Sequence, residues 1–285
     1  MATRQMVRWL AFVAVCVAVL SQGTLDPAAA LRAQSPAASS PVADSMPDSE
    51  IERFLLEGRV VKTRSAGKGV TNSIRATLTL GSLTHDAQIQ TIDEKKTTGP
   101  SSQGTELNFR DSWAFNVAAY RIDRLIGLNL VPVSVERDWR SKAGAYTWWV
   151  DDVMMDEGGR LKKNLQPPDP FKWNETMQLI RIFDQLIYNM DRNLGNLLIT
   201  NDWDVWAIDH TRAFRLHKTL KTPANVTRCD RKVFEGLKRL DAGILQKEVG
   251  RYLTNWEREA LLVRRDAIVK IIEQGGEGAL FDRKQ

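Results

Sequence analysis

An acid, an amide and a second acid follow one another at defined spacing in the second half of the sequence. Asp191 comes directly after a predicted helix, Asn196 lies five residues later, and Asp209 lies thirteen residues beyond Asn196. Carboxylate and amide oxygens are suitable ligands for Mg²⁺. Phosphoryl transfer from ATP needs such a set: one carboxylate orients or deprotonates an acceptor hydroxyl, while the other carboxylate and the amide oxygen hold Mg²⁺ against the phosphates.

Two short apolar segments, 197–200 and 205–208, lie between Asn196 and Asp209 and are joined by Asn-Asp-Trp-Asp at 201–204. This pattern predicts a β-hairpin, which would hold the two ligands more rigidly than a long loop. A single aspartate often does no more than cap a turn. The joint spacing of two acids, one amide and a hairpin favours a metal and phosphate site.

This region resembles the atypical branch of the protein-kinase-like superfamily: HipA-type kinases, phosphatidylinositol 3- and 4-kinases, CotH-type spore-coat kinases and secreted Golgi casein-kinase-like enzymes. The Asp-Arg-x-x-x-Asn catalytic loop and the Ile-Asp metal motif of that superfamily match Asp191-Arg192 to Asn196 and Ile208-Asp209. The match is specific over 183–214. The resemblance implies that Asp191 is the catalytic base, that Asn196 and Asp209 bind the metal, and that ATP and Mg²⁺ are the cofactors.

A small-residue segment, Gly67-Lys68-Gly69-Val70-Thr71-Asn72-Ser73, lies where the superfamily covers the nucleotide phosphates with a loop. Backbone N–H groups in such a loop can cradle a phosphate. Gly67, Gly69, Thr71 and Asn72 are therefore candidate nucleotide-binding residues. An ordinary turn is an equally good interpretation of the same composition.

The small lobe departs from the superfamily at two positions. Gln90 stands where a lysine normally holds the α- and β-phosphates, and Asn116 stands where a helix glutamate normally pairs with that lysine. Replacing lysine by glutamine removes a full charge from the phosphate site. Lys95 or Lys96 is the candidate substitute for the lysine, and Glu106 for the glutamate.

Three further side chains near the loop have competing interpretations. We expect Asp184 to be structural and to bond loop amides. Arg192 is expected to pair with a neighbouring carboxylate rather than to contact substrate. His210 either orients the Asp209 carboxylate or only packs against its neighbours. The sequence has no Gly-x-Ser-x-Gly elbow and no zinc-binding pattern, so serine-hydrolase and zinc chemistry are not indicated.

The first 33 residues have the order of a secretory signal peptide: Arg4 and Arg8, an uncharged apolar run over 9–20, then small residues near Ala33. A membrane-spanning helix needs roughly 20 apolar residues, so no stable membrane anchor is expected. Residues 34–50 are rich in Ala, Ser and Pro and predict a disordered linker. These features indicate export to a periplasmic or extracellular location.

Composition sets further bounds. The formal charge of +5 is small, and no basic run with interleaved aromatic residues indicates nucleic-acid binding. Cys229 is the only cysteine beyond the predicted leader, so an internal disulfide is excluded and stability must come from a packed core. The roughly 230 remaining residues are enough to bury one.

Strands are predicted between Arg59 and Asp93, with alternating apolar positions over 74–80 and 87–92 and turn residues at 81–82 and 85–86. The composition of 94–104 predicts a loop. Helical spacing follows over 109–126, with Gly127 as its C-terminal cap. Two more strands are predicted, over 130–135 and 147–150. These elements predict a small lobe over 51–150, made of an antiparallel sheet and a helix.

The second lobe, 151–285, is predicted to be mainly helical. A polar connector over 158–170 precedes a helix over 174–188, and the segment 230–274 is helical. Thr254 to Glu257 fits a capping box, and Gly275-Gly276 ends the last helix. The fold expected from both halves and from the resemblance is a two-lobed α+β protein-kinase-like fold.

The predicted function is Mg²⁺-dependent transfer of phosphate from a nucleotide to a hydroxyl acceptor, which is a protein, a glycan or a small molecule. Two alternatives stay open. One is an inactive kinase-fold binding or structural protein, for which Gln90 and Asn116 argue. The other is transfer of AMP. No nucleic-acid partner is expected.

Overall fold

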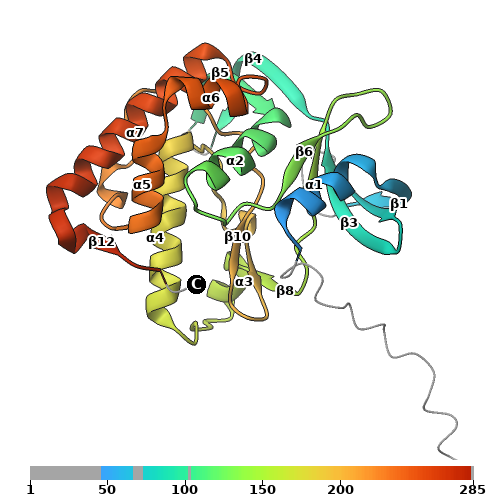
Figure 1. Ribbon diagram of the computed structural model, residues 1–285, viewed down its shortest axis with the longest axis horizontal. Helices are drawn as coiled ribbons and strands as arrows, with labels where there is room; N and C mark the ends of the chain where they lie inside the picture. Colours follow the sequence, from blue (N-terminus) through green and yellow to red (C-terminus); the bar gives the residue numbers. More distant parts are fainter. Residues whose placement is uncertain (1–45, 67–72, 102–103, 284–285) are drawn as a thin grey trace, which may run out of the picture. The chain divides into compact units, whose positions relative to one another are not determined.

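The computed structural model describes residues 46–66, 73–101 and 104–283 (Figure 1). The predicted phosphate loop, with Gly67, Gly69, Thr71 and Asn72, lies outside these ranges, as do the leader and most of the predicted linker. The first helix begins at Asp48, three residues before the predicted start of the small lobe at Ile51.

The predicted antiparallel sheet of the small lobe is confirmed, and it has five strands in the order β1-β2-β3-β7-β6. Every neighbouring pair is antiparallel. The tight turn between the second and third strands contains Gly81, whose φ of 60° a glycine adopts without strain. The strands and the helix that packs on them are α1 (Asp48–Glu57), β1 (Arg59–Ser65), β2 (Ile74–Leu80), β3 (Leu83–Gln90), β6 (Ser134–Glu136) and β7 (Ala145–Trp148).

Strand β3 shows how alternation creates two faces. Ala87 and Ile89 are fully buried in the core that they share with Phe54 of α1. Side chains of successive strand residues point to opposite faces, so Gln88 and Gln90 lie on the other face. That second face is turned toward the catalytic elements, because Gln88 lines a small cavity with Asp209. His85 and Asp86 are inside β3, so they are not the turn that the sequence predicted.

The predicted loop over 94–104 is wrong: this stretch belongs to a long hairpin of β4 (Asp93–Ser101) and β5 (Gly104–Ser112). The two strands pair only with each other. Most described side chains on β4 are exposed and polar, so no apolar alternation marks the strand in the sequence. The hairpin also takes up residues 109–112, which the sequence assigned to the following helix.

Helix α2 (Ala114–Leu125) starts five residues later than predicted and buries eight of its twelve residues. The predicted C-terminal cap is confirmed: Gly127 has φ of 73°, a conformation that favours glycine. Behind it, the buried Asp123 carboxylate accepts hydrogen bonds from the backbone nitrogens of Asn129, Leu130 and Val131. These bonds fix the chain in an irregular path, so that of the predicted strand 130–135 only Ser134 and Val135 pair in the sheet, as part of β6.

The second lobe is mainly helical, as predicted. Its helix α3 replaces part of the predicted connector, because Asp156 accepts a bond from Gly159 N and caps a short helix. The helices are α3 (Glu157–Lys162), α4 (Pro170–Ile187), α5 (Arg231–Arg239), α6 (Ala242–Val249) and α7 (Asn255–Gly275), with 3-10 turns η1 (Leu194–Asn196), η2 (Pro223–Asn225) and η3 (Gly276–Ala279). The strands are β8 (Val153–Asp156), β9 (Leu197–Thr200) and β10 (Val205–Ala207) in one sheet, and β11 (Cys229–Asp230) and β12 (Leu280–Phe281) in a parallel pair.

Helices α4 and α7 lie side by side along the second lobe (Figure 1). The predicted capping box at the start of α7 is confirmed: Thr254 Oγ1 accepts from Glu257 N, and Glu257 Oε2 accepts from Thr254 N at 2.7 Å. Helix α4 ends at Ile187, directly before the segment that carries Asp191. The helix pair therefore forms the base on which the catalytic loop rests.

Within the residues that the structure describes, no helix combines the length and the apolar character needed to cross a membrane.

Candidate active site

The loop that follows α4 is shaped by its own side chains. Tyr188 ends the helix in the left-handed conformation, with φ of 49°. Asn189 then donates from its backbone to Asp184 O at 2.9 Å and from Nδ2 to Asp184 Oδ1 at 3.1 Å. The Asn189 Oδ1 atom accepts from Asp191 N at 3.0 Å. The Asp184 carboxylate was predicted to bond backbone amides of the loop, and it instead bonds the side chains of Asn189 and Arg192. The Asn189 bonds hold Asp191 at the start of the loop.

Asn196 and Asp209 are brought together by the predicted hairpin, which strands β9 and β10 form in antiparallel pairing. Ile208 N donates to Asn196 O at 3.0 Å, so the residue before Asp209 is bonded directly to Asn196. The Asn196 side chain turns back and donates from Nδ2 to Asp191 O at 3.2 Å. Hydrogen bonds thus connect Asp191 to Asn196, and Asn196 to the residue before Asp209.

Arg192 joins the two halves of this site. Its Nη1 donates to Asn196 O at 3.0 Å and to Ile208 O at 2.9 Å, and its Nε donates to Asp184 Oδ2 at 3.1 Å. The expected pairing of Arg192 with a carboxylate is therefore confirmed. One planar guanidinium fixes the spacing between the catalytic loop and the metal motif, a task that its fork of donors suits.

His210 is a packed hydrogen-bond acceptor. Its side chain is 1 % exposed, and its Nε2 lies 2.9 Å from Arg192 Nη2, which can only donate. Burial and the Arg192 charge hold the pKa of His210 well below its ordinary value, so the ring is neutral. His210 N also donates to Asn116 Oδ1 at 2.7 Å. The residue orients Arg192 and ties α2 to the metal motif.

We expect Arg192→Lys to lower the free energy of unfolding by about 1–3 kcal/mol, because lysine cannot reach both carbonyls and Asp184 together. Urea unfolding of the parent and the variant measures this difference. Arg181→Lys is the matched control, since Arg181 is exposed on the preceding helix. Equal midpoints for Arg192→Lys and the parent would show that the fork geometry is dispensable.

Asp209 adopts a left-handed backbone conformation, with φ of 54°. Such strain in a non-glycine residue is typical of functional sites. Burial raises the pKa of its carboxyl above the ordinary value and the Asp191 charge adds to this, whereas the Thr211 hydroxyl and the Gln90 amide act in the opposite direction. The Thr211 Oγ1 donor lies 3.1 Å from Asp209 Oδ1. A partly buried carboxylate of this kind is stabilised by a bound cation.

The two departures noted in the sequence form one pair. Asn116 Nδ2 donates to Gln90 Oε1 at 2.5 Å, and both side chains are buried. A neutral amide pair therefore links β3 to α2. Gln90 Nε2 has no partner at hydrogen-bonding distance among the described residues, yet the amide is close enough to Asp209 to lower the pKa of that carboxyl. This buried, unsatisfied N–H is available to an anion such as a phosphate.

Neither candidate lysine contacts the Gln90 and Asn116 pair. Lys95 lines an open groove on the hairpin, and Lys96 Nζ bonds Glu94 Oε2 at 2.5 Å on an exposed surface. No contact of either lysine with Asp209 occurs within the described ranges. The proposal that a lysine substitutes for Gln90 from β4 therefore has no support in the geometry.

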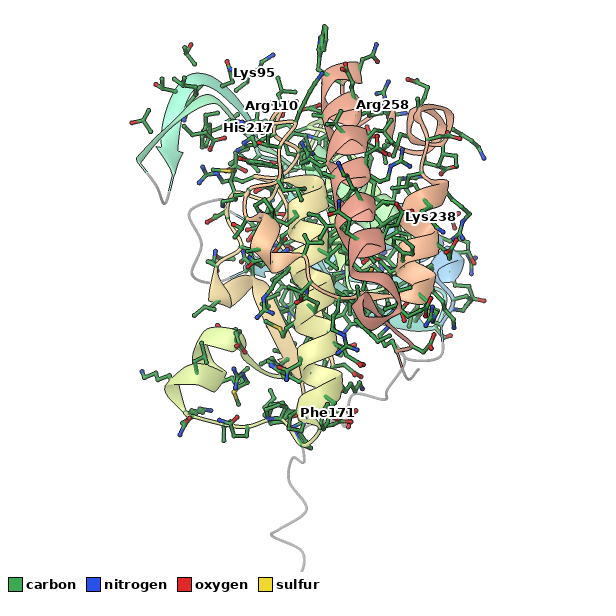
Figure 2. All side chains as sticks on the ribbon, turned by 90° about the vertical axis from the view of Figure 1, so that its left-hand side faces the viewer. Lys95, Arg110, Phe171, His217, Lys238 and Arg258 are labelled. Carbon is green, nitrogen blue, oxygen red and sulfur yellow. The ribbon has the colours of Figure 1, made fainter. Side chains whose placement is uncertain are left out.

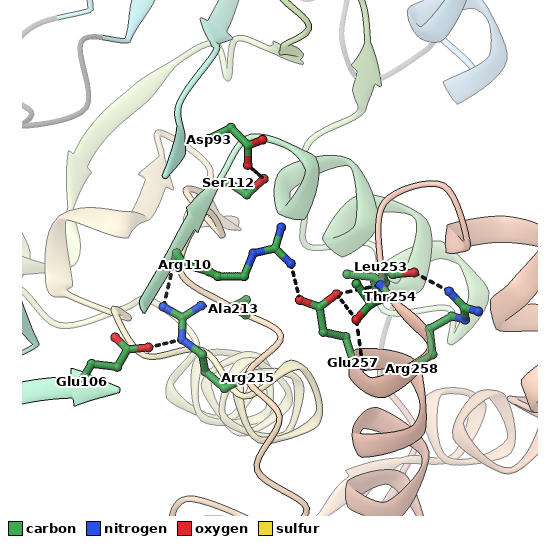
Figure 3. A network of polar contacts seen from close by, with 10 residues as sticks. All are labelled: Asp93, Glu106, Arg110, Ser112, Ala213, Arg215, Leu253, Thr254, Glu257 and Arg258. Carbon is green, nitrogen blue, oxygen red and sulfur yellow. Dashed lines mark hydrogen bonds and ion pairs between the residues drawn. The ribbon is translucent and has the colours of Figure 1, made fainter. Parts of the chain in front are cut away.

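Glu106 is placed differently from the sequence expectation, because it does not pair with a lysine. Its Oε2 accepts from Arg212 Nη2 at 2.8 Å, and its Oε1 accepts from Arg215 Nε (Figure 3). Both arginines belong to the segment after the metal motif. The Glu106 carboxylate thus anchors the hairpin on that segment. It does not take the part of the helix glutamate that pairs with a lysine.

The network continues from Arg215 through the hairpin to α7. Arg215 Nη2 donates to Arg110 O at 2.7 Å, and Arg110 Nη1 donates to Glu257 Oε1 at 2.6 Å (Figure 3). Glu257 is the capping-box residue and is 3 % exposed. The segment after Asp209, the β4–β5 hairpin and α7 are therefore held together by one network of charged side chains.

Glu106→Gln is expected to loosen the hairpin, because a neutral amide leaves two arginines with one acceptor fewer. The free energy that stabilises the hairpin should fall by about 2–4 kcal/mol, as for other buried pairs that lose one partner. Hydrogen exchange of β4 and β5 reports it directly. Glu94→Gln, on the exposed part of the same hairpin, is the control, and equal protection in both variants would contradict the anchoring role.

An open groove of about 1010 Å³ runs between the hairpin and the start of α7. Lys95 and Arg110 of the hairpin and His217 of the segment after Asp209 line it, and Figure 2 labels these three residues in one part of the molecule. Met190, next to Asp191, lines the same groove. The groove therefore reaches the loop that carries Asp191.

The donor set fits a magnesium ion that is shared with a ligand. Among the described residues, no three His, Cys, Asp or Glu side chains converge to hold a metal unaided. The available donors are the Asp209 carboxylate and the Asn196 amide oxygen, and Mg²⁺ is commonly bound by one or two carboxylates together with substrate phosphates. The partly buried Asp209 and the unsatisfied Gln90 N–H are consistent with such a site.

Comparisons with solved structures identify the class of fold. The chain is similar to a hydra Fam20 with sugar (14 % identity, TM-score 0.60, 83 % of this chain and 93 % of that chain covered). It is also similar to a Golgi casein kinase with Mn/ADP bound (11 % identity, TM-score 0.56, 83 % and 78 % covered). No protein-family model matches the chain, and no curated protein matches it in sequence.

The chain thus has an atypical protein-kinase-like fold, with a small antiparallel-sheet lobe and a larger helical lobe. The resemblance inferred from Asp191, Asn196 and Asp209 is confirmed at the level of the fold. The roles of these three residues remain predictions, because fold similarity at 11–14 % identity carries no residue assignment.

Sequence reasoning missed two side chains that the structure places at the site. Asp111 is buried at the end of β5, next to the segment that follows Asp209. Arg264 of α7 is fully buried and bonds the end of α4 and the segment after Asp209. Asp111 lay in a stretch taken for the start of a helix. A charged residue at a core position of α7 was the only signal for Arg264.

Proposed function

We propose that the chain is an exported kinase-like enzyme that transfers phosphate from a Mg²⁺-bound nucleotide to a hydroxyl acceptor. The observation that carries this proposal is the contact between Asp191, Asn196 and the residue before Asp209, which Arg192 spans. The fold supports it, since the similar structures include kinases.

Asp191 is the proposed base. It lies at the start of the loop, partly exposed, where it can orient an acceptor hydroxyl and take up its proton. Asn196 and Asp209 are the proposed metal ligands. A bound Mg²⁺ would neutralise charge on the nucleotide phosphates. Arg192 keeps the base and the ligands at fixed separation, which is the preorganisation that phosphoryl transfer requires.

Gln90 supplies a hydrogen-bond donor where related folds place a charge. Its free Nε2 can bond a phosphate oxygen, and Asn116 fixes the orientation of the amide. Because this pair carries no charge, attraction for the nucleotide depends on the cation. Nucleotide affinity should therefore be more strictly metal-dependent than in a site with a lysine.

The test is incubation with ATP labelled at the α or the γ phosphorus, with Mg²⁺ and a mixture of candidate acceptors. Transfer of the γ label supports the proposal. A thermal-shift titration with Mg²⁺ and ATP runs beside it, and the absence of both transfer and shift would remove the proposal. Asp191→Asn should keep the thermal shift and lose transfer by roughly 10²–10⁴-fold, the usual contribution of a general base.

The neutral Gln90 and Asn116 pair favours a second candidate function. An inactive kinase-fold protein would bind a partner without transferring phosphate, and it would give a thermal shift with nucleotide at most. Transfer of the α label would instead assign AMP transfer. The same labelling experiment therefore separates all three outcomes.

Export is proposed from residues 1–33, whose basic, apolar and small-residue regions follow the order of a signal peptide. Expression with a C-terminal tag and N-terminal sequencing of the exported protein tests it. A mature N-terminus near Gln34 is the expected result, and retention of Met1 in the cell interior would contradict it.

A further inference from the structure

The end of strand β5 places an unused carboxylate beside the metal motif. Asp111 is 7 % exposed, and its Oδ1 has no hydrogen-bond partner among the described residues. A buried carboxylate oxygen without a donor is unfavourable and needs a compensating interaction. Nothing in the function proposed above uses this group.

Backbone contacts fix where Asp111 lies. Ser112 N donates to Thr211 O at 2.9 Å, so the end of β5 is bonded to the residue two positions after Asp209. Thr211 Oγ1 donates to Asp209 Oδ1 at 3.1 Å, and the same hydroxyl is close enough to Asp111 to act on the pKa of that carboxyl. One threonine hydroxyl is thus placed between two carboxylates that come from different lobes.

The surroundings of Asp111 are rich in negative charge. Glu94 lies directly opposite it in the hairpin, a cross-strand position in which like charges repel. Burial raises the pKa of Asp111, and the charges of Asp209 and Glu94 raise it further, while Arg212 acts in the opposite direction. Arg212 is itself bonded to Glu106.

We propose that Asp111 and Asp209 bind one divalent cation together, so that the small lobe contributes a carboxylate to the metal site. The inference rests on the proposed metal role of Asp209 and extends it. The cation then connects β5 to the metal motif before any nucleotide binds.

The experiment is a titration of the full chain with Mn²⁺ alone, without nucleotide, in which electron paramagnetic resonance measures the free ion. The parent should bind one Mn²⁺. Asp111→Asn should weaken this binding by roughly 10- to 100-fold, since a carboxylate oxygen is lost from the ion. Asp93→Asn is the matched control on the same hairpin, because its carboxylate is bonded to Ser112 Oγ at 2.8 Å, and it should bind like the parent.

A second measurement distinguishes a ligand from a purely structural residue. Without metal, Asp111→Asn should melt at the same temperature as the parent or higher, because the substitution removes a repelling buried charge. With Mn²⁺, the parent should gain more stability than the variant. A variant that melts lower without metal and gains equally with it would overturn the proposal, and Asp111→Ser provides the same comparison if the amide variant misfolds.

The outcomes are separable from those of the labelling test. If Asp111→Asn binds Mn²⁺ as tightly as the parent, and the parent transfers phosphate, only the role of Asp111 would be removed. If Asp111→Asn binds Mn²⁺ more weakly and the parent transfers no phosphate, the result would support the two-carboxylate site and count against the proposed enzyme activity. Absence of Mn²⁺ binding by the parent would overturn the inference itself.

Discussion

Asp209→Asn is expected to lower phosphate transfer by at least about 100-fold and to remove the Mg²⁺-dependent thermal shift with ATP. The physical reason is the loss of the charged ligand: a metal ion supplies several kcal/mol of stabilisation to phosphoryl transfer, and each 1.4 kcal/mol is tenfold in rate. The measurements are initial rates with γ-labelled ATP and the melting temperature with and without metal.

The same variant should not be less stable than the parent in the absence of metal. Burial raises the pKa of the Asp209 carboxyl, so the charged form is disfavoured in the folded state. An amide of the same shape removes this cost and can still accept from Thr211. Asp202→Asn, in the exposed turn of the β9–β10 hairpin, is the control and should behave as the parent. Normal transfer by Asp209→Asn would rule out this residue as a metal ligand.

Arg264→Met is expected to give the largest loss of stability, about 3–5 kcal/mol, because three buried carbonyls lose their donor at about 1–3 kcal/mol each. Arg264 is 0 % exposed and lies on α7. Its Nε donates to Leu186 O at 2.8 Å, and its Nη1 donates to Arg215 O at 3.0 Å and to His217 O. Methionine fills the volume but leaves three buried carbonyls unpaired.

Urea unfolding checks this value, and Lys270→Met is the matched control because Lys270 is exposed on the same helix. The control should stay within about 0.5 kcal/mol of the parent. Arg264 clamps the end of α4 to the segment after the metal motif, so the variant should also lose transfer activity more than nucleotide affinity. A loss below about 1 kcal/mol would show that water replaces the guanidinium.

Burial lowers the pKa of Arg264 to about 10, but the group stays charged at neutral pH. A buried cation that is bonded only to carbonyls is costly to maintain in a core. Arg264 bonds both Leu186 and His217, and these residues flank the segments that carry the proposed site residues. We infer that the cost of burying the charge is offset by the fixed position of those segments.

Local signals were sufficient for part of the fold. The helix before Asp191, the β9–β10 hairpin and the Thr254–Glu257 capping box were predictable, because each depends on residues close in sequence. The proposed site residues share this property. Asp191, Asn196 and Asp209 lie within nineteen positions of one another, so their proximity follows from one helix end and one hairpin.

The β4–β5 hairpin was not predictable in the same way. Strand β4 has no large apolar side chain, β5 has only Leu107 and Phe109, and among the described residues the two strands pair only with each other. The apolar alternation that marks a half-buried strand is therefore too short to be recognised. What holds the hairpin in place is Glu106 on Arg212 and Arg215, more than a hundred residues away. Periodicity carries no information about a contact of this range.

The pairing of Gln90 with Asn116 was equally hidden. Each residue alone was a departure from the superfamily pattern, and their relation appears only where β3 and α2 meet. The two departures compensate: an amide has replaced each member of an ion pair, and the contact between strand and helix is kept.

The bond from His210 N to Asn116 Oδ1 has a consequence for control of the protein. The Asn116 side chain bonds Gln90 of β3 and also His210, next to Asp209. An outward movement of α2 would therefore break two buried hydrogen bonds at once. Switching by displacement of this helix is therefore disfavoured. In the proposed enzyme, activity would therefore follow the supply of cation and nucleotide rather than a displacement of α2.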